Sequence, residues 1–319
     1  MDMEATTPYE PKTLLEAIKY FTSPDNCLRY LVTKRWPQGV TCPTCGCQDV
    51  IFLANQRRWK CRNQHPQRQF SVKVGTVMED SPIGLDKWLT AMWQIVNCKN
   101  GISSYEVHRA IGVTQKTAWF LDHRIRFALG LEDAGKLSGH VEADETFIGG
   151  KARFMHAHVK ARRVTGTGGK DKTAVMGILE RGGKVRTVVV PNRKKSALQA
   201  EVRKHVEAGS ALYTDALKSY EGLDDFQHQV IDHAEKYVEG NVHTNGMENF
   251  WSLLKRGLHG TYVSVEPFHL FRYLDEQMYR YNNRKMDDGQ RFSLAVSQIV
   301  GKRLTWDVLT GKNSSPTIN

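Results

Sequence analysis

The 319-residue sequence contains no apolar stretch long enough to span a membrane, and its first eleven residues lack the basic start and apolar run of a secretory signal. We therefore expect a cytoplasmic protein with no membrane partner. Acidic residues are in the minority, with 34 Asp and Glu against 45 Lys and Arg, a formal net charge of +11 and a pI near 9.3. This imbalance favours an anionic polymer as partner, although charge alone does not separate a nucleic-acid-binding protein from an ordinary basic enzyme.

Cysteine is also scarce, with six residues in the chain. Four of them lie between Cys42 and Cys61, which is too few and too clustered for a disulfide framework in a chain of this length. A metal site explains the cluster better than a set of reduced core cysteines, because Cys42-Pro43-Thr44-Cys45-Gly46 is a tight turn that presents two thiolates. Cys27 and Cys98 fall within predicted helices, where we interpret them as small apolar core residues.

A second pair of soft donors completes the metal site. Cys61 and His65 follow the turn after fifteen residues that include β-type runs, and four such donors suit tetrahedral Zn²⁺. Cys47 offers a competing thiolate. The sequence therefore predicts a zinc ribbon with one structural Zn²⁺, held by Cys42, Cys45, Cys61 and His65.

Downstream of this ribbon, three helices are well signalled. Apolar residues recur at helical spacing between Leu85 and Val96, and Ser103 with Glu106 makes the capping-box pair of a second helix. A turn at 112–114 leads into a third helix over 115–129, which completes a helix-turn-helix pattern. In the third helix we expect an inward face of Ala118, Trp119, Ile125 and Leu129, and an outward face of Gln115, Lys116, His123, Arg124 and Arg126.

An exposed helix with this outward face has the chemistry to enter a DNA major groove. We therefore predict DNA contacts from Gln115, Lys116, Arg124 and Arg126. The alternative is a plain helical hairpin whose basic face is solvated. The basic zinc ribbon directly upstream favours DNA.

The remaining chain alternates between strands and helices. Strand-like runs at 141–148, 173–179 and 184–190 precede a helix at 196–206 and a short strand at 211–214, an order that indicates an α/β domain. We divide the chain into a helical lead-in (1–36), the zinc ribbon (37–80), the helix-turn-helix region (81–135), the α/β domain (136–300) and a C-terminal tail (301–319).

Acidic residues lie at three notable places in the α/β domain. Glu142, Asp144 and Glu145 interrupt an otherwise apolar strand, where ionised side chains are costly without a partner. Asp215 directly follows a short strand, at the carboxyl end where α/β sheets place ligands. Glu248 flanks the buried face of a predicted helix.

That helix carries further candidate residues. Met247, Phe250 and Trp251 belong to its buried face, and at 100° per residue Glu248, Ser252 and Lys255 share one flank. Arg256 points more nearly away from the core, together with Asn249, and we count both Lys255 and Arg256 as DNA contacts.

Three carboxylates from a strand, a strand end and a helix suit two Mg²⁺ or Mn²⁺ ions, because hard cations take oxygen ligands and leave positions open for phosphate and water. We therefore predict metal-dependent phosphoryl transfer by Asp144, Asp215 and Glu248, with Lys255 neutralising a phosphate oxygen. The substrate would be DNA, not a small molecule. Taken singly, each acid is more often a member of a surface ion pair than a ligand.

Together these residues resemble the ISXO-like insertion-sequence transposases, which join a zinc ribbon to a DDE-type catalytic domain with a ribonuclease-H-like fold. The matching stretches are 35–46, 69–76, 101–104, 115–119, 141–151, 213–215 and 248–255.

The resemblance implies that Asp144, Asp215 and Glu248 form the DDE triad, with Lys255 as the basic residue seven positions after the last acid. Some members carry Asn as the third residue, which leaves Asn245 and Asn249 as alternatives to Glu248. Others carry Cys where this chain has His65.

The resemblance also implies the overall function. The chain would bind the terminal inverted repeats of its element, cut the DNA and transfer strands to a target, as a dimer or higher oligomer that handles two ends together. Two alternatives remain open, a metal-dependent nuclease that cuts without joining and a zinc-ribbon DNA-binding regulator whose catalytic domain has decayed.

Overall fold

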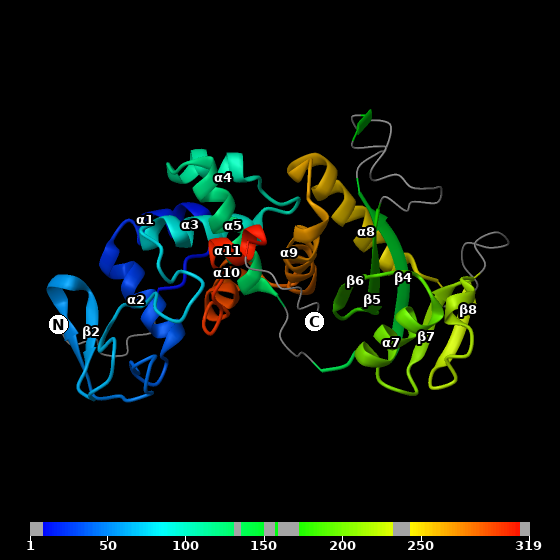
Figure 1. Ribbon diagram of the computed structural model, residues 1–319, viewed down its shortest axis with the longest axis horizontal. Helices are drawn as coiled ribbons and strands as arrows, with labels where there is room; N and C mark the ends of the chain where they lie inside the picture. The colour runs from blue at the N-terminus through cyan, green and yellow to red at the C-terminus, as the bar shows by residue number, and fades with distance from the viewer. Residues whose placement is uncertain (1–8, 131–134, 150–156, 159–171, 232–242, 313–319) are drawn as a thin grey trace. The chain divides into compact units, whose positions relative to one another are not determined.

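The computed structural model describes residues 9–130, 135–149, 157–158, 172–231 and 243–312 (Figure 1). Contacts group the chain into two compact units, Met1–Gly130 with Arg284–Asn319 (unit 1) and Leu131–Asn283 (unit 2). Within the described ranges, none of the helices is both long and apolar enough to cross a membrane.

Unit 1 is built mainly of helices with well-formed N-terminal caps. The capping box of Ser103 and Glu106 forms as predicted, and Thr114 accepts a hydrogen bond from the Thr117 amide. The apolar face of the helix at 85–97 is buried from Trp88 to Val96, as its spacing predicted. The helices are α1 (Leu14–Phe21), α2 (Pro24–Arg35), α3 (Leu85–Asn97), α4 (Ser104–Ile111), α5 (Gln115–Leu129), α10 (Asp288–Ser297) and α11 (Trp306–Thr310).

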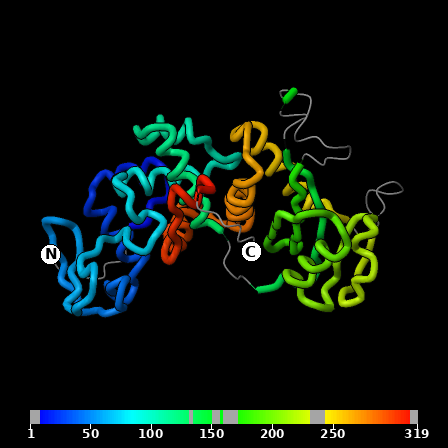
Figure 2. The backbone as a smooth tube through the Cα atoms, in the orientation of Figure 1, coloured from blue at the N-terminus to red at the C-terminus, as the bar shows by residue number. Residues whose placement is uncertain are grey.

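Residues 284–312 belong to unit 1, which differs from the predicted division of the chain. The ring of Phe292, which is completely buried, lies 4.9 Å from that of Trp93 and 5.8 Å from those of Phe21 and Tyr30. Lys302 donates to the carbonyls of Ala128 and Gly130 at 2.9 and 3.1 Å. Figure 2 shows the red C-terminal segment returning to the blue and cyan helices of this unit. The predicted extension of the α/β domain to residue 300 and the separate tail are therefore wrong, because long-range aromatic packing decides where this segment lies.

The zinc-ribbon region forms a three-stranded antiparallel sheet of β1 (Val50–Leu53), β2 (Arg58–Cys61) and β3 (Gln69–Phe70). A single 3-10 turn, η1 (Ala54–Gln56), connects β1 to β2. Trp59 on β2 is buried against Phe70 and Trp36, with ring centroids 6.0 and 5.6 Å away. These aromatic contacts give the small sheet an apolar face of its own.

Helix α5 does not present the basic face that its sequence predicted. Arg124 and Arg126 are only 5% and 2% exposed, and His123 is completely buried. The Arg124 guanidinium donates to the carbonyl of Glu79 and lies over the rings of Trp88 and Phe120. The prediction that these three side chains point outward is wrong. The backbone at Glu79 covers Arg124, and the Trp119 ring lies 4.4 Å from that of His123.

The first turn of α5 remains accessible. Lys116 is exposed and its Nζ lies 4.6 Å from the ring of Trp306 on α11, while Gln115 donates to the Ser104 hydroxyl at 2.9 Å. Trp119, predicted to pack inward, is half-buried and its ring lies 5.9 Å from that of Trp306.

Unit 2 confirms the predicted α/β class. Its five-stranded sheet has the order β6-β5-β4-β7-β8, with antiparallel pairing on the β5 side of β4 and parallel pairing on the β7 side. The strands are β4 (His140–Ile148), β5 (Thr173–Glu180), β6 (Val185–Val190), β7 (Ala211–Asp215) and β8 (Gln227–Ile231).

Helices cover both faces of this sheet. Helix α7 (Lys195–His205) and the 3-10 turn η3 (Lys218–Tyr220) pack with one core cluster, and α8 (Asn245–Gly257) and α9 (Leu270–Asn282) pack with the other. Two short segments, η4 (Leu258–Tyr262) and η5 (Pro267–His269), connect α8 to α9.

Because side chains alternate along a strand, β4 sends its acids to both faces of the sheet. Val141 and Ala143 lie in the α7 cluster, whereas Glu142 and Asp144 contact α8.

Candidate functional site

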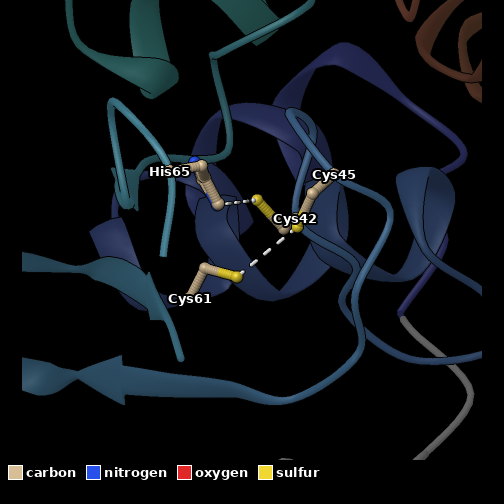
Figure 3. Close-up of side chains that lie close together, drawn as sticks. All are labelled: Cys42, Cys45, Cys61 and His65. Atoms are coloured by element: carbon tan, nitrogen blue, oxygen red, sulfur yellow. Dashed lines mark hydrogen bonds between the residues drawn. The ribbon is translucent and has the colours of Figure 1, made fainter. Parts of the chain in front are cut away.

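The four predicted zinc ligands come together in unit 1. One ligand atom from each of Cys42, Cys45, Cys61 and His65 lies within 4.8 Å of the others (Figure 3). Cys42 Sγ is 3.5 Å from His65 Nε2, and Cys45 Sγ is 3.6 Å from Cys61 Sγ. Cys47, the competing thiolate, lies outside this group and its sulfur accepts the Asp49 amide at 3.3 Å. The structure therefore confirms the Cys₃His set that the spacing predicted.

Backbone geometry explains why these residues meet. Gly46 has φ +73°, a left-handed conformation that glycine adopts without strain, and its amide donates to the Cys42 carbonyl at 2.8 Å. Cys61 ends β2, where it pairs with Val50. The turn and the strand end thus bring both donor pairs to one side of the small sheet.

The tautomer of His65 suits a metal ligand. Its Nδ1 lies 2.6 Å from the Pro66 carbonyl, a contact that requires a proton on Nδ1. The lone pair of Nε2 then faces Cys42. Imidazoles that ligate zinc are oriented in this way, with the far nitrogen donating to a carbonyl or carboxylate.

The thiols of this cluster differ in acidity. Burial opposes ionisation of Cys42, but the amides of Cys45 and Thr44 donate to its sulfur and lower its pKa to about 7. Burial raises the pKa of Cys61 to about 11, and the neighbouring Cys45 and Cys42 sulfurs add to this rise. Because metal ligation requires thiolates, a bound cation would complete the ionisation of this cluster.

In unit 2, the three predicted catalytic acids occupy neighbouring elements. Asp144 lies on β4, Asp215 ends the adjacent β7, and Glu248 lies in the first turn of α8. Strands β4 and β7 run parallel with Glu142 opposite Tyr213, so that 144 and 215 hold corresponding positions two residues further along. The register therefore places the two aspartates at corresponding positions of the adjacent interior strands β4 and β7.

The pKa of Asp144 is shifted by its surroundings. Its pKa is raised to about 6, mainly by burial and in smaller part by the charges of Asp215 and Glu248, while the hydrogen bonds from the Glu145 amide and the Trp251 indole oppose the rise. Those two donors lie 2.8 Å from Oδ1 and 3.0 Å from Oδ2. Among the described residues, the three carboxylates are not as tightly grouped as the Cys₃His donors.

Gly177 makes room for the Trp251 indole and has no counterpart in the sequence prediction. It pairs with Asp144 across β4 and β5, and a Cβ there would lie 2.1 Å from Met247 Cε and 2.6 Å from Trp251 Cζ2. A glycine in the middle of a strand often marks such a close approach, which is the signal that could have identified it.

On the opposite face of the sheet, Glu145 accepts a hydrogen bond from the Tyr220 hydroxyl. The pKa of Glu145 is raised to about 7, mainly by burial and in smaller part by the charges of Asp215 and Asp144. Glu145 is therefore a neighbour of the predicted triad that points away from α8.

The other predicted residues of α8 are accessible to different degrees. Lys255 is half-buried, whereas Arg256, Asn245 and Asn249 are exposed. Glu248 is exposed as well, and it is the residue of α8 whose charge acts on Asp144.

Comparison with known proteins identifies the family of both units. A family model described as ISXO2-like transposase domain matches residues 136–282, and one described as transposase zinc-ribbon domain matches residues 22–63. No solved structure is significantly similar to the chain.

Two relatives carry related names. The chain is 30% identical over 260 residues to an uncharacterized protein in transposable element ISH50 of Halobacterium salinarum. The aligned region covers 76% of this chain and 85% of that protein. The chain is also 37% identical over 105 residues to an uncharacterized transposase-like protein of Haemophilus influenzae. That aligned region covers 32% of this chain and 85% of that protein. The family that the motifs resembled is thus the right one, and the chain belongs to the ISXO2-like transposases.

Proposed function

We propose that this chain binds the terminal inverted repeats of an insertion sequence and catalyses Mg²⁺-dependent DNA cleavage and strand transfer. The observation that carries the proposal is the placement of three acids that are far apart in the sequence: Asp144 on β4, Asp215 at the end of the adjacent parallel strand β7, and Glu248 in the first turn of α8, the helix whose Trp251 contacts Asp144. Unit 2 would be the ribonuclease-H-like DDE catalytic domain.

The donor chemistry of these residues fits divalent cations. Three carboxylates supply only oxygen, the ligand type that Mg²⁺ and Mn²⁺ prefer, and a bound cation would stabilise the ionised form of Asp144, whose pKa is raised mainly by burial. Two bound ions would supply an activated attacking oxygen and stabilise the leaving oxygen in phosphoryl transfer.

The surrounding side chains would orient these ligands and the DNA. The Trp251 indole holds Asp144 Oδ2 and so sets the direction of the remaining lone pairs. Lys255 lies two turns after Glu248 on the same flank of α8, where its ammonium group would neutralise a non-bridging phosphate oxygen.

DNA binding would involve both units. We assign phosphate or base contacts to the accessible residues Gln115, Lys116, Lys255 and Arg256, whereas the buried Arg124 and Arg126 stabilise α5 instead. The Cys₃His set would hold one structural Zn²⁺ that keeps the basic ribbon folded. A dimer is expected, since two element ends must be handled together.

The proposal is tested with purified protein, Mg²⁺, labelled DNA carrying the ends of the element, and a supercoiled target. We expect joined products from the wild type. The Asp144→Asn variant should lose cleavage and retain DNA binding, whereas Asp225→Asn, which alters a carboxylate paired with Arg203, should keep activity.

Other outcomes separate the alternatives. Cleavage without joining would identify a nuclease. DNA binding without any cleavage by the wild type would identify a regulator. Unchanged cleavage by Asp144→Asn would remove the catalytic assignment.

A further inference from the structure

Glu142 is a second buried acid on the α8 face of β4. It lies two residues before Asp144, so both side chains project from the same face of the strand, and it is only 1% exposed. A buried carboxylate is costly unless it is fully paired. Its partners show what it does in the fold.

One oxygen of Glu142 caps helix α8. The helix begins at Asn245, and the side chain of the N-cap residue Thr244 makes no capping hydrogen bond. The Met247 amide instead donates to Glu142 Oε2 at 3.0 Å. A carboxylate at this position satisfies a free amide of the first turn and interacts favourably with the helix dipole.

The other oxygen, together with Arg181, holds His243, which directly precedes the N-cap residue Thr244. Arg181 Nε donates to Glu142 Oε1 at 2.8 Å, and Arg181 Nη2 donates to the His243 carbonyl at 2.6 Å. His243 Nδ1 also lies 3.3 Å from Glu142 Oε1. The guanidinium lies over the ring of Tyr213, 4.1 Å from its centroid, so the network connects β4, β7 and the start of α8.

Gly246 allows this close approach of helix and strand. A Cβ at this position would lie 2.8 Å from Glu142 Oε2 and 2.6 Å from Leu179 Cδ2. The first turn of α8 therefore contacts the sheet through its backbone.

We propose that Glu142 is a positioning residue that sets the place of Glu248 relative to Asp144. This inference rests on the proposed function. Helix α8 is attached to β4 at two points, by Met247 to Glu142 and by Trp251 to Asp144, and Glu248 lies between them. Releasing the first point leaves α8 free to shift or fray in the turn that carries Glu248, which weakens the shared cation site without removing any of its ligands.

The test measures Mn²⁺ binding to the full-length, zinc-loaded protein by calorimetry. Binding that persists in the Asp144→Asn variant is treated as background and subtracted. We expect Glu142→Ala to weaken this binding by about tenfold or more, the usual effect of removing an outer-shell partner. Glu142→Gln retains one acceptor for the Met247 amide and should lie between the two. Hydrogen exchange of the peptide 244–250 without Mn²⁺ should be faster in Glu142→Ala.

Gly246→Ala provides an independent variant that keeps the carboxylate. Alanine favours a helix more than glycine does, so weaker Mn²⁺ binding by this variant would reflect displacement of α8 and not a poorer helix. The matched control is Glu201→Ala, which removes a partly buried carboxylate paired with His205 on α7, on the other side of the sheet. It should bind Mn²⁺ as the wild type does.

The outcomes are distinguishable. If the wild type shows no Asp144-dependent Mn²⁺ binding, the proposed function fails and this inference fails with it. If the wild type binds Mn²⁺ and Glu142→Ala binds equally well, the inference alone is overturned. Should Glu142→Ala not fold, wild-type affinity in both Glu142→Gln and Gly246→Ala overturns it.

Discussion

The indole nitrogen of Trp251 donates a hydrogen bond to Oδ2 of Asp144 at 3.0 Å, which links helix α8 to the central strand of the sheet. The two residues are 107 positions apart in the sequence. The other oxygen, Oδ1, accepts the Glu145 amide at 2.8 Å, so both carboxylate oxygens are held by donors of the protein.

Replacing Trp251 with Phe should therefore weaken the cation site. The ring keeps most of its packing against Met247 and Phe250, but Asp144 loses a donor that fixes its orientation. We expect Mn²⁺ affinity to fall by about tenfold. Trp93→Phe, in the core of unit 1, serves as a control for general loss of stability and should leave Mn²⁺ affinity unchanged.

Gly177→Ala should destabilise unit 2. The added methyl group would overlap Met247 and the Trp251 ring, and overpacking of this kind costs about 1–3 kcal/mol. Denaturant unfolding gives the measurement. Gly260→Ala is the control, because nothing lies within 4 Å of its Cβ position, and a change of less than about 0.5 kcal/mol is expected.

Removal of a zinc ligand should release the metal from unit 1. Metal analysis should find about one zinc per wild-type chain and much less in Cys42→Ser, Cys61→Ser and His65→Ala. His65→Cys should retain zinc, since four thiolates also suit this ion. Cys47→Ser is the control, and loss of zinc from it would show that the ligand set is different.

Cys27 should resist alkylation in the folded protein. Its side chain is completely buried, its sulfur donates to the Phe21 carbonyl at 3.1 Å, and burial raises its pKa to about 12. At pH 8 its thiolate population is then about a thousandfold below that of an ordinary thiol. Maleimide should therefore label the half-buried Cys98 before it labels Cys27. Rapid labelling of Cys27 in native protein would contradict this.

The same shift has a consequence for stability at high pH. Folding favours the protonated thiol of Cys27, so its contribution is fully present below the unfolded pKa of 9.0 and is lost as pH rises through about 12. A comparison of the wild type with Cys27→Ala across pH 8 to 10 should show a steeper loss of stability for the wild type.

Arg256→Ala should weaken DNA binding in a salt-dependent way. Loss of one phosphate contact should reduce the slope of log affinity against log salt by about 1, with similar effects on all sequences. Arg203→Ala is the matched control, because this exposed arginine lies on α7 and is paired with Asp225. Equal slopes for the wild type and Arg256→Ala would remove Arg256 from the interface.

Short-range patterns were sufficient to predict several features of this protein. The Ser103–Glu106 capping box and the two donor pairs of the Cys₃His set, Cys42 with Cys45 and Cys61 with His65, depend on spacing along a few residues, and the pairing of β1 with β2 brings the two donor pairs together. Strand alternation likewise places Asp144 on one face of β4. Such features are determined by the sequence because their geometry is set within single turns and strands.

Only the tertiary structure decided which residues would be covered by distant parts of the chain. Helical periodicity assigned Arg124 to solvent, but the backbone at Glu79 covers it. Residues 284–312 joined unit 1 because Phe292 packs with aromatic rings more than 190 residues away, such as that of Trp93 at 4.9 Å. The cap that Glu142 provides to α8 also depends on a contact across 105 positions. These contacts depend on packing between elements, which no local pattern records.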